Sequence, residues 1–506
     1  MITFRTFQPD PDRRAHTIAK DAIALPSRVR LEGDMLVCES PTGDAVALGV
    51  QHDLGPLGSL ALRTCLLPQR EAPYLLSLEL ARQRVMRLLE ALENWRLTAL
   101  PPTHPAMVAI ERTLEAFTLA LVEGRGPDRA FTSRQAELAN TALSLAIDAG
   151  EALALECANR RLLARFEDQE VKTPQIGCAV HVERFAEPLQ KLIASGLGFM
   201  TSPMRWPDIE PQEGKFSFVK TDRWIEWAVR QARIPVVAGP VLDFSKAQTP
   251  EWMHIWRHDY DTVRECVYEH VTRVVTRYRR TVSRWTAVSG LNLNDDYSLS
   301  TDQMVELTRL VIHVIRKLQP SAKVTVDLDQ PFGDHTGRNP ESVAPRLYAE
   351  MVLDAGVHVD AFGLRLQMGD GRDGRETRDL LQIARLIDDF ASLERPIHIT
   401  AMGVPDAPSD APGAGRWRQA WSPEHQARWL GHAIAIAAAN HKVQSVCWQA
   451  LYDLPGDEPH SAMTRGALID ERGQAKPALR RFLEIARALH ARTRPTLEMQ
   501  AQGARA

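Results

Sequence analysis

The spacing of hydrophobic and polar residues divides the first third of the chain into two parts. Residues 1–73 contain short, alternating apolar stretches that Gly, Asp and Pro interrupt, a pattern typical of small antiparallel strands. Over residues 74–168, apolar residues recur at helical spacing in stretches that the breaks LPPTHP and GRGPDR separate. We therefore predict a β-rich, β-sandwich-like module over 1–73 and a helical hairpin or three-helix segment over 74–168.

A different rhythm begins at about residue 171, where short β-branched runs alternate with longer runs of helical spacing. The eight candidate strands are IGCAVHV, GLGFMTS, IPVVAGP, SRWTAVS, KVTVDL, DAFGLRL, PIHITA and VQSVCW. An open, doubly wound sheet is the competing fold, but no G-x-G-x-x-G follows the first strand. We predict an α/β fold with a (β/α)8 TIM barrel over 171–490 and a flexible tail over 491–506.

Composition and charge narrow the classes of partner. The 61 Lys and Arg residues nearly balance the 64 Asp and Glu residues, so the chain lacks the basic excess that nucleic-acid binding needs. No apolar run approaches the roughly 18–20 residues of a membrane helix. We therefore expect neither a nucleic-acid partner nor a membrane-spanning segment.

The first residues of the chain and its cysteines indicate in which cellular compartment we expect the protein. The sequence MITFRTFQPDPDRRAH carries charges where a secretory signal has its apolar core. Six well-separated cysteines form no C-x-x-C pair, so we expect buried thiols in a reducing, cytoplasmic setting. His254 and His258 have the spacing of the zinc motif H-E-x-x-H, but Ile255 replaces its glutamate. We expect no metal site and no cofactor.

Several segments of the predicted barrel occur in the order of a known family. MRWPDIEPQEGKFSFVKTDRWIEWA precedes VVAGPVLDFSKAQTPEW, and RWTAVSG, DAFGLRLQM, IHITAMGVP, CWQALYD and GALIDERGQAKPAL follow. This succession resembles glycoside hydrolase family 10, the retaining endo-β-1,4-xylanases, over roughly residues 171–490. The resemblance implies two carboxylates about 5–5.5 Å apart at the C-terminal mouth of a TIM barrel.

Both catalytic positions of that family carry other residues here. The acid/base belongs to a W-D-V-V-N-E motif at the fourth strand, which reads WTAVSG in this chain and places Gly290 at the glutamate. The nucleophile belongs to an I-T-E-L-D motif at the seventh strand, which reads ITAMG and places Ala401 there. The comparison predicts a xylanase-like pseudoenzyme that lacks retaining hydrolysis.

The sugar-contacting positions of the family also differ. Arg205 replaces the lysine of the M-K-W string, whereas Trp206 is kept, and Phe244 stands at a tryptophan position. In the sixth-strand G-x-Q-x-H motif, Arg365 and Gln367 replace the glutamine and the histidine. The candidate ligand-binding residues are Arg205, Trp206, Phe244, Arg365, Gln367 and Trp448. The three rings would stack on sugars and the polar groups would donate hydrogen bonds, unless the rings simply fill the top of the barrel.

Other carboxylates follow the predicted strands and would project toward the same mouth. The candidates that could replace the missing pair are Asp243, Asp295, Asp296, Asp327 and Asp329. An inverting mechanism would need two of them roughly 6.5–9.5 Å apart. The alternative is that these side chains cap helices or accept hydrogen bonds from loops.

Three hypotheses about function follow from these patterns. The favoured one is a barrel that binds a β-linked oligosaccharide or polysaccharide without turnover. The second is an active O-glycosyl hydrolase that uses relocated carboxylates. The third is an intracellular scaffold whose first 168 residues bind a protein partner or self-associate. Residues 1–73 could also be a carbohydrate-binding-like β module.

Overall fold

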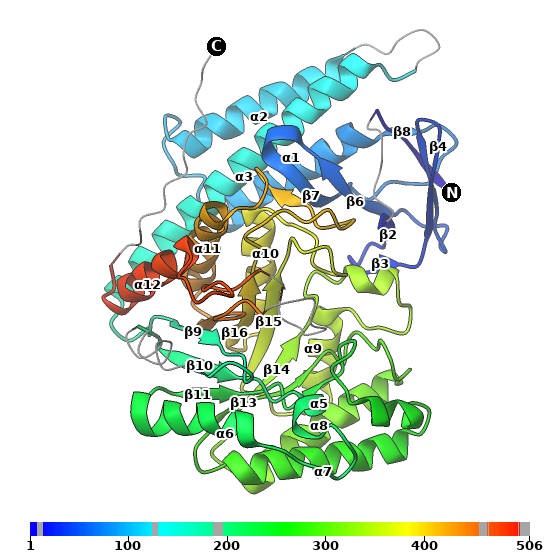
Figure 1. The fold of residues 1–506 in the computed structure, drawn as a ribbon. Coiled ribbons are helices and arrows are strands. Elements are labelled where there is room, and N and C mark those ends of the chain that lie inside the picture. The colour runs from blue at the N-terminus through cyan, green and yellow to red at the C-terminus, as the bar shows by residue number, and fades with distance from the viewer. Residues whose placement is uncertain are drawn as a thin grey trace.

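A computed structural model describes residues 1–7, 14–123, 130–185, 196–454, 463, 465–493 and 495. Of the tail predicted over 491–506, only 491–493 and 495 belong to the described residues. In Figure 1, the N-terminal strands and helices cover one side of the barrel, and the ring of barrel strands lies below them.

Eight parallel strands form the barrel. They are β9 (Gln175–Ala179), β10 (Phe199–Ser202), β11 (Val236–Ala238), β13 (Arg284–Ser289), β14 (Lys323–Leu328), β15 (Ala361–Gln367), β16 (Ile397–Gly403) and β18 (Val443–Trp448). Pairing of β18 with β9 and of β11 with β13 closes the ring. The short strand β12 (Leu242–Asp243) extends the sheet at the end of β13. Each strand overlaps one of the eight predicted runs, which confirms the predicted barrel.

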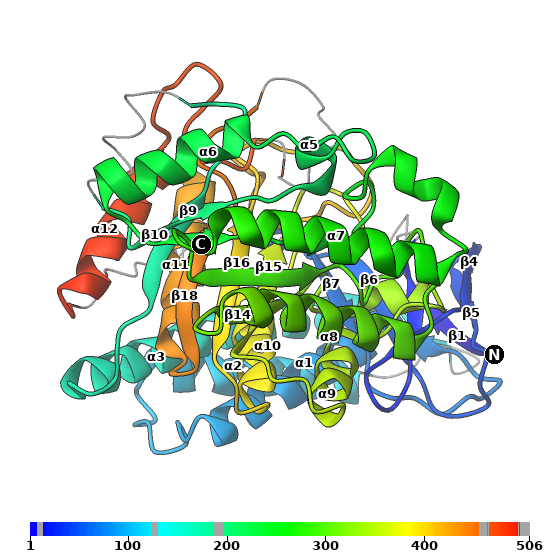
Figure 2. The same ribbon diagram turned by 90° about the horizontal axis from the view of Figure 1, so that it is seen from below.

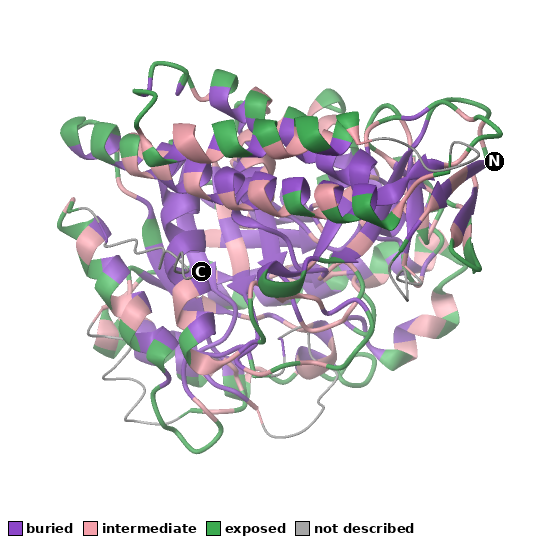
Figure 3. Cartoon of the chain, turned by 90° about the horizontal axis from the view of Figure 1, so that it is seen from above, coloured by how far each residue is buried: buried purple, intermediate pink, exposed green. Residues whose placement is uncertain are grey.

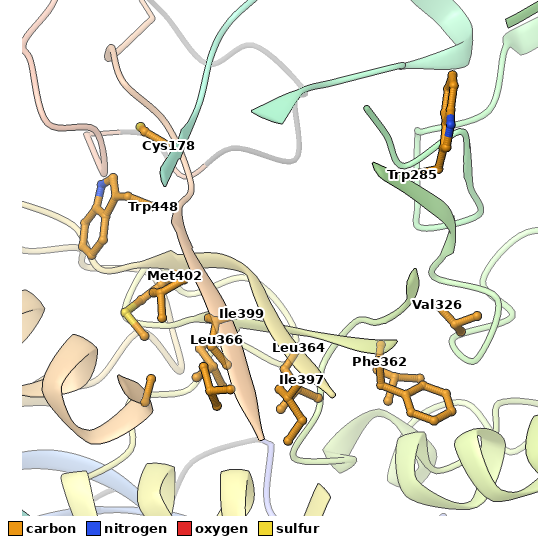
Figure 4. Packing of buried hydrophobic residues seen from close by; sticks show 14 of the residues in the cluster. Cys178, Trp285, Val326, Phe362, Leu364, Leu366, Ile397, Ile399, Met402 and Trp448 are labelled. Atoms are coloured by element: carbon orange, nitrogen blue, oxygen red, sulfur yellow. The ribbon is translucent and has the colours of Figure 1, made fainter. Parts of the chain in front are cut away.

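Helices surround these strands and bury their apolar faces against them. They are α6 (Val219–Glu226, continued by a π-helical turn over Trp227–Ala232), α7 (Tyr260–Tyr278), α8 (Thr301–Leu318), α9 (Pro345–Asp354), α10 (Leu380–Ala391), α11 (Pro423–Ala439) and α12 (Pro477–His490). Capping boxes begin α8 at Ser300 and α10 at Asp379, where each side chain accepts backbone N–H groups that the helix leaves unpaired. Figure 3 shows helices whose buried and exposed residues alternate around buried strands, and Figure 4 shows Met402 and Trp448 in the same buried layer.

The N-terminal part contains two small sheets, one mixed because β1 and β8 pair in parallel, and one antiparallel. One has the order β4-β5-β1-β8 and the other β17-β7-β6-β2-β3. Their strands are β1 (Ile2–Arg5), β2 (His16–Ile18), β3 (Ala24–Leu25), β4 (Arg28–Glu32), β5 (Met35–Glu39), β6 (Ala47–Asp53), β7 (Gly58–Arg63), β8 (Tyr74–Leu75) and β17 (Arg416–Trp417). The strand β17 comes from the barrel loop between β16 and α11 and pairs with β7. The N-terminal strands therefore share a sheet with the barrel segment instead of forming a closed module.

Three helices follow these strands, as the sequence predicts for this segment: α1 (Leu76–Asn94), α2 (Pro105–Val122) and α3 (Ser133–Glu167). Residues of both small sheets share a hydrophobic core with α1 and α3. The helix α3 also packs against α10 and α11 of the barrel, as Figures 1 and 2 show. By length and composition α3 is long and apolar enough to cross a membrane, so the expectation that no run reaches that length is wrong. However, 61% of its most apolar window is buried inside this fold.

The cysteines depart in part from the sequence expectation. Four of the six are buried, but Cys65 and Cys266 are half-buried. All six are free thiols.

One buried carboxylate joins α3 to the barrel. Glu151 is 1% exposed and accepts hydrogen bonds from the Trp417 indole (2.5 Å), the Arg418 guanidinium (2.5 Å) and the Leu380 backbone N–H (3.2 Å). Burial raises the pKa of this carboxyl, while the Arg418 charge opposes the shift. Glu151 thus connects the helical segment with two barrel loops.

We expect Glu151→Gln to lower the free energy of unfolding by about 3–5 kcal/mol, because it leaves the Arg418 guanidinium without its buried countercharge. Asp148 contacts the same guanidinium at 2.8 Å but is 45% exposed, so Asp148→Asn should cost about 1 kcal/mol or less. Urea unfolding of both variants tests this expectation. If both variants lose the same free energy of unfolding, burial of Glu151 does not strengthen its contribution to stability.

Candidate functional site

A cavity of about 1070 Å³ occupies the inside of the barrel. Its lining reaches from Gln175 and Arg284 at the N-terminal ends of the strands to Asp243 and Arg365 at the mouth. TIM barrels are usually filled by layers of bulky branched side chains. Here small side chains line much of the interior, namely Thr201, Thr286, Thr325, Ala361 and Cys447. Of the predicted site residues, Arg205, Asp243, Asp327, Arg365 and Gln367 belong to the lining of this cavity.

The mouth is organised around the guanidinium of Arg365. Its Nε lies 2.7 Å from Asp327, its Nη2 lies 3.0 Å from Asp243, and its Nη1 lies 3.4 Å from Asp329. Arg365 itself is only 8% exposed. Three of the five candidate carboxylates therefore converge, but on a cation that neutralises part of their charge.

Asp327 is the most buried of these carboxylates, with an exposure of 1%. It also accepts hydrogen bonds from the Ser289 hydroxyl at 3.0 Å and from the Thr400 hydroxyl. The carboxylate fits only because residue 363 is glycine, since a Cβ atom there would lie 2.4 Å from Asp327 Oδ1. Neighbouring strands thus supply the hydrogen-bond donors that the carboxylate of Asp327 needs.

The pKa values of two carboxyl groups move in opposite directions. Burial raises the pKa of Asp327 above its usual value, despite the opposing charge of Arg365. Burial also acts on Asp329, but the charges of Arg365 and Arg375 outweigh it and lower the pKa of that group. Asp327 is consequently the easier of the two to protonate.

Gly290 and Ala401, the two positions that the sequence comparison predicts to correspond to catalytic glutamates, differ in the space around them. Gly290 has φ +70°, and a Cβ atom there would lie 2.4 Å from both the backbone N and the Oγ of Ser245. Ser245 is held in place because its hydroxyl donates to Asp243 at 2.6 Å and to Asp329 at 3.2 Å. Ala401, by contrast, lines the cavity. The fourth strand therefore ends in a turn that has no room for a side chain.

The other candidate carboxylates lie elsewhere. Asp295 is exposed and Asp296 is half-buried, and neither belongs to the described residues that line the barrel cavity. Asp406 and Asp453, which follow the seventh and eighth strands, both form ion pairs with the buried Lys476. Asp406 and Asp453 therefore serve to hold the buried ammonium group of Lys476 in place.

The three candidate aromatic residues are buried, and none of them is among the described residues that line the barrel cavity. Trp206, Phe244 and Trp448 are 2%, 3% and 0% exposed. The Trp206 ring stacks on His270 at 4.4 Å, and the Trp448 indole donates to the Gly466 carbonyl at 2.9 Å. These contacts are those of rings that fill the top of the barrel, which is the alternative given above.

The polar candidates do reach the cavity. Arg205 lines it and donates to both oxygens of Asp208 at 2.9 Å and to Gln248 at 3.1 Å. Gln367 also lines it and donates to Gln449. Sequence reasoning missed Gln449, although it directly follows the tryptophan of the eighth strand.

The two histidines at zinc-motif spacing do not share a helix face. A short 3₁₀ helix over Glu251–Trp256 contains His254 but ends before His258. His254 contacts the Thr249 hydroxyl at 3.3 Å, and His258 accepts from Arg257. Among the described residues, no group of three or more His, Cys, Asp or Glu side chains is arranged to hold a metal ion.

We expect Arg365→Met to lower the free energy of unfolding at pH 7 by about 3–5 kcal/mol, because three carboxylates would then face one another without a cation. The folded-state pKa values of these acids would rise, so the variant should regain stability as the pH falls from 7 to 5. Urea unfolding at both pH values measures this effect. Lys323→Met, which removes an exposed cation of the same barrel, is the control, and a pH-independent loss for Arg365→Met would contradict the account.

Comparison with known proteins points to one family. The profile of glycosyl hydrolase family 10 matches residues 167–485. Endo-1,4-beta-xylanase 3 of Hypocrea jecorina is 23% identical over 204 residues, which is 38% of this chain and 55% of that protein. Endo-1,4-beta-xylanase B of Humicola insolens is 28% identical over 102 residues, 20% of this chain and 28% of that protein. The chain thus spans about half the length, or less, of these curated relatives.

Solved structures of low sequence identity are also similar. Xylanase 10B from Thermotoga maritima is 16% identical, and the match covers 66% of this chain and 99% of that chain with a TM-score of 0.48. A GH10 structure from Paenibacillus barcinonensis is 17% identical, with 65% and 97% covered and a TM-score of 0.48. The family profile covers more than half of the residues, including every strand of the barrel. The chain therefore belongs to glycosyl hydrolase family 10.

Proposed function

We propose that this chain binds a β-1,4-linked xylo-oligosaccharide at the mouth of its barrel and does not hydrolyse it by the family's retaining mechanism. One observation carries the proposal: the carboxylates nearest the mouth are ion-paired with Arg365, while Gly290 and Ala401 supply none. The name of the curated relatives, endo-1,4-beta-xylanase, suggests the ligand class.

The loss of retaining chemistry follows from what each missing group would do. A general acid must protonate the leaving oxygen, which contributes about 10²–10⁴ in rate. A carboxylate on the other side must attack the anomeric carbon to form the covalent intermediate. Gly290 has no side chain, and the methyl group of Ala401 is not a nucleophile. Neither half of the reaction has a group at the family position.

Binding depends on a different set of atoms. The cavity, at about 1070 Å³, lies just above the range of small-molecule sites in general, which is roughly 300–1,000 Å³. Arg205, Gln367 and Gln449 place amide and guanidinium groups in its wall. Sugar hydroxyls both donate and accept hydrogen bonds, so these groups suit them. Because the candidate rings are buried, hydrogen bonds rather than stacking would carry the affinity.

A second candidate function is hydrolysis by relocated carboxylates. The opposite pKa directions of Asp327 and Asp329 favour it, because an acid and a base with separated pKa values are what such a reaction needs. Against it, Asp327 is 1% exposed and already accepts bonds from Arg365, Ser289 and Thr400. Proton transfer to a sugar would require this network to open.

The scaffold hypothesis has less support. It treats the first 168 residues as a separable part, but β17 of the barrel segment completes one N-terminal sheet, and Glu151 bonds to Trp417 and Arg418. Removing the barrel would expose these contacts. We therefore rank the scaffold hypothesis below the two carbohydrate hypotheses.

Isothermal titration with xylotetraose should show saturable binding, and chromatography of the same sample should show no shorter sugars. Gln367→Ala should weaken binding about 3- to 10-fold, as expected for the loss of a net hydrogen bond. Asp296→Asn, outside the cavity lining, should bind as the unchanged protein does. Release of xylobiose that Asp327→Asn abolishes would instead establish the second candidate function.

The double variant Gly290→Glu/Ala401→Glu should not regain hydrolysis, because a side chain at residue 290 collides with Ser245. Gly290→Ala alone should lower the free energy of unfolding by about 1–3 kcal/mol, the usual cost of overpacking. Ala401→Gln, at a position that lines the cavity, should cost less. Thermal unfolding and a reducing-sugar assay test both statements, and hydrolysis by a stable double variant would contradict them.

A further inference from the structure

A second cavity, of about 680 Å³, lies on the flank of the barrel and shares no lining residue with the first. Its walls come from strands β2, β6 and β7, from α1, and from α9 and α10 of the barrel. It therefore exists only because the N-terminal sheets pack against the barrel. The proposed xylo-oligosaccharide site does not involve this cavity.

Arginine dominates the charged lining of this cavity. Five acidic residues line it, namely Asp21, Asp334, Glu350, Glu376 and Asp389. They face eight arginines, namely Arg14, Arg63, Arg84, Arg87, Arg338, Arg346, Arg378 and Arg385. A chain with a net charge of −3 thus gathers more arginines than acids in the lining of this one cavity.

Four of the acids are already paired with particular arginines. Glu376 contacts Arg14 at 3.2 Å and Arg338 at 2.8 Å. Asp334 pairs with Arg378, and Arg346 contacts both Glu350 and Asp389. The fifth acid, Asp21, is exposed. Acids outside the lining pair with three more of the arginines, because Asp379 contacts Arg84, and Glu90 contacts both Arg87 and Arg385.

Arg63 is the cation that remains. It is the last residue of β7 and pairs through its backbone with Gly49 of β6, and it is half-buried. Its guanidinium makes no hydrogen bond and no ion pair with the described residues. Burial and the nearby charges of Arg87, Arg378 and Arg385 lower the pKa of its guanidinium to about 10. A guanidinium has five donors and normally finds carboxylate or phosphate acceptors.

Two further donors in the same wall also have no acceptor. Arg378 is 8% exposed and Arg84 is 5% exposed, and the Nε atom of each is buried without a hydrogen-bond partner among the described residues. Their terminal nitrogens are engaged by Asp334 and Asp379. Buried polar groups are nearly always paired, but Glu376 Oε2 and Asp379 Oδ2 are buried without a partner among the described residues as well. The unpaired guanidinium of Arg63 is therefore the observation that points to an acceptor in the cavity.

We propose that this flank cavity binds the phosphoryl group of a small phosphate monoester, with Arg63 as its central ligand. Phosphate oxygens accept several charge-assisted hydrogen bonds at once, and guanidinium groups match them bidentately. The volume of the cavity exceeds what a phosphoryl group fills and leaves room for a sugar-sized substituent.

The test is isothermal titration of the full chain with inorganic phosphate, glucose 6-phosphate and glucose. We expect glucose 6-phosphate to bind more tightly than phosphate, and glucose not to bind at this cavity. Arg63→Gln should weaken glucose 6-phosphate binding about tenfold or more, whereas Arg63→Lys should retain part of it. If inorganic phosphate binds more tightly than glucose 6-phosphate, the ligand is the free anion, and the proposal of a phosphate monoester is wrong.

Matched controls separate this site from general effects of charge and from the barrel mouth. Arg30→Gln removes a 54% exposed cation on β4 outside the cavity and should leave phosphate binding unchanged. Xylotetraose binding should be equal in Arg63→Gln and in the unchanged protein, so failure of one proposal is distinguishable from failure of the other. The proposal is wrong if neither inorganic phosphate nor glucose 6-phosphate shows saturable binding. It is also wrong if Arg63→Gln, with an unchanged melting temperature, binds glucose 6-phosphate as tightly as the unchanged protein does.

Discussion

The convergence of three carboxylates on the single guanidinium of Arg365 is the constraint on which the mouth of the barrel depends. Placing several acids in a buried site is costly unless a cation and hydrogen-bond donors compensate them. Arg365 supplies the cation, and Ser289 and Thr400 supply donors to Asp327. The same arrangement holds Asp243, and through it Ser245, against the end of the fourth strand. The space that an acid/base side chain would need at residue 290 is thereby taken.

This arrangement also explains why polarity at the mouth does not by itself imply hydrolysis. A catalytic pair needs one carboxyl group that can protonate the leaving oxygen and another that can act from the opposite side of the sugar ring. The acids at this mouth are instead directed toward a guanidinium between them. The cavity lining also presents the amide and guanidinium groups of Arg205, Gln367 and Gln449, on which the proposed binding of a xylo-oligosaccharide depends.

Much of the fold could be predicted from the sequence, because β-branched runs and amphipathic helices alternate clearly from residue 171 onward. The register of the WTAVSG and ITAMG strings also located Gly290 and Ala401 at the ends of their strands. The Arg365 cluster could not be predicted, because its partners come from different strands, and Asp243 lies 122 residues away. Nor does a tryptophan at a strand end reveal which way its ring faces, and Trp206 and Trp448 point into the core. The pairing of β17 with β7 likewise joins segments too distant for any local pattern to indicate.

A crystal structure of the chain with xylotetraose tests the central claim most directly. The account predicts an intact tetrasaccharide at the mouth, hydrogen-bonded to Gln367 or Arg205, with the ion pairs of Arg365 unbroken. Cleaved sugar at the mouth, with Asp327 turned away from Arg365 toward the glycosidic oxygen, would contradict it.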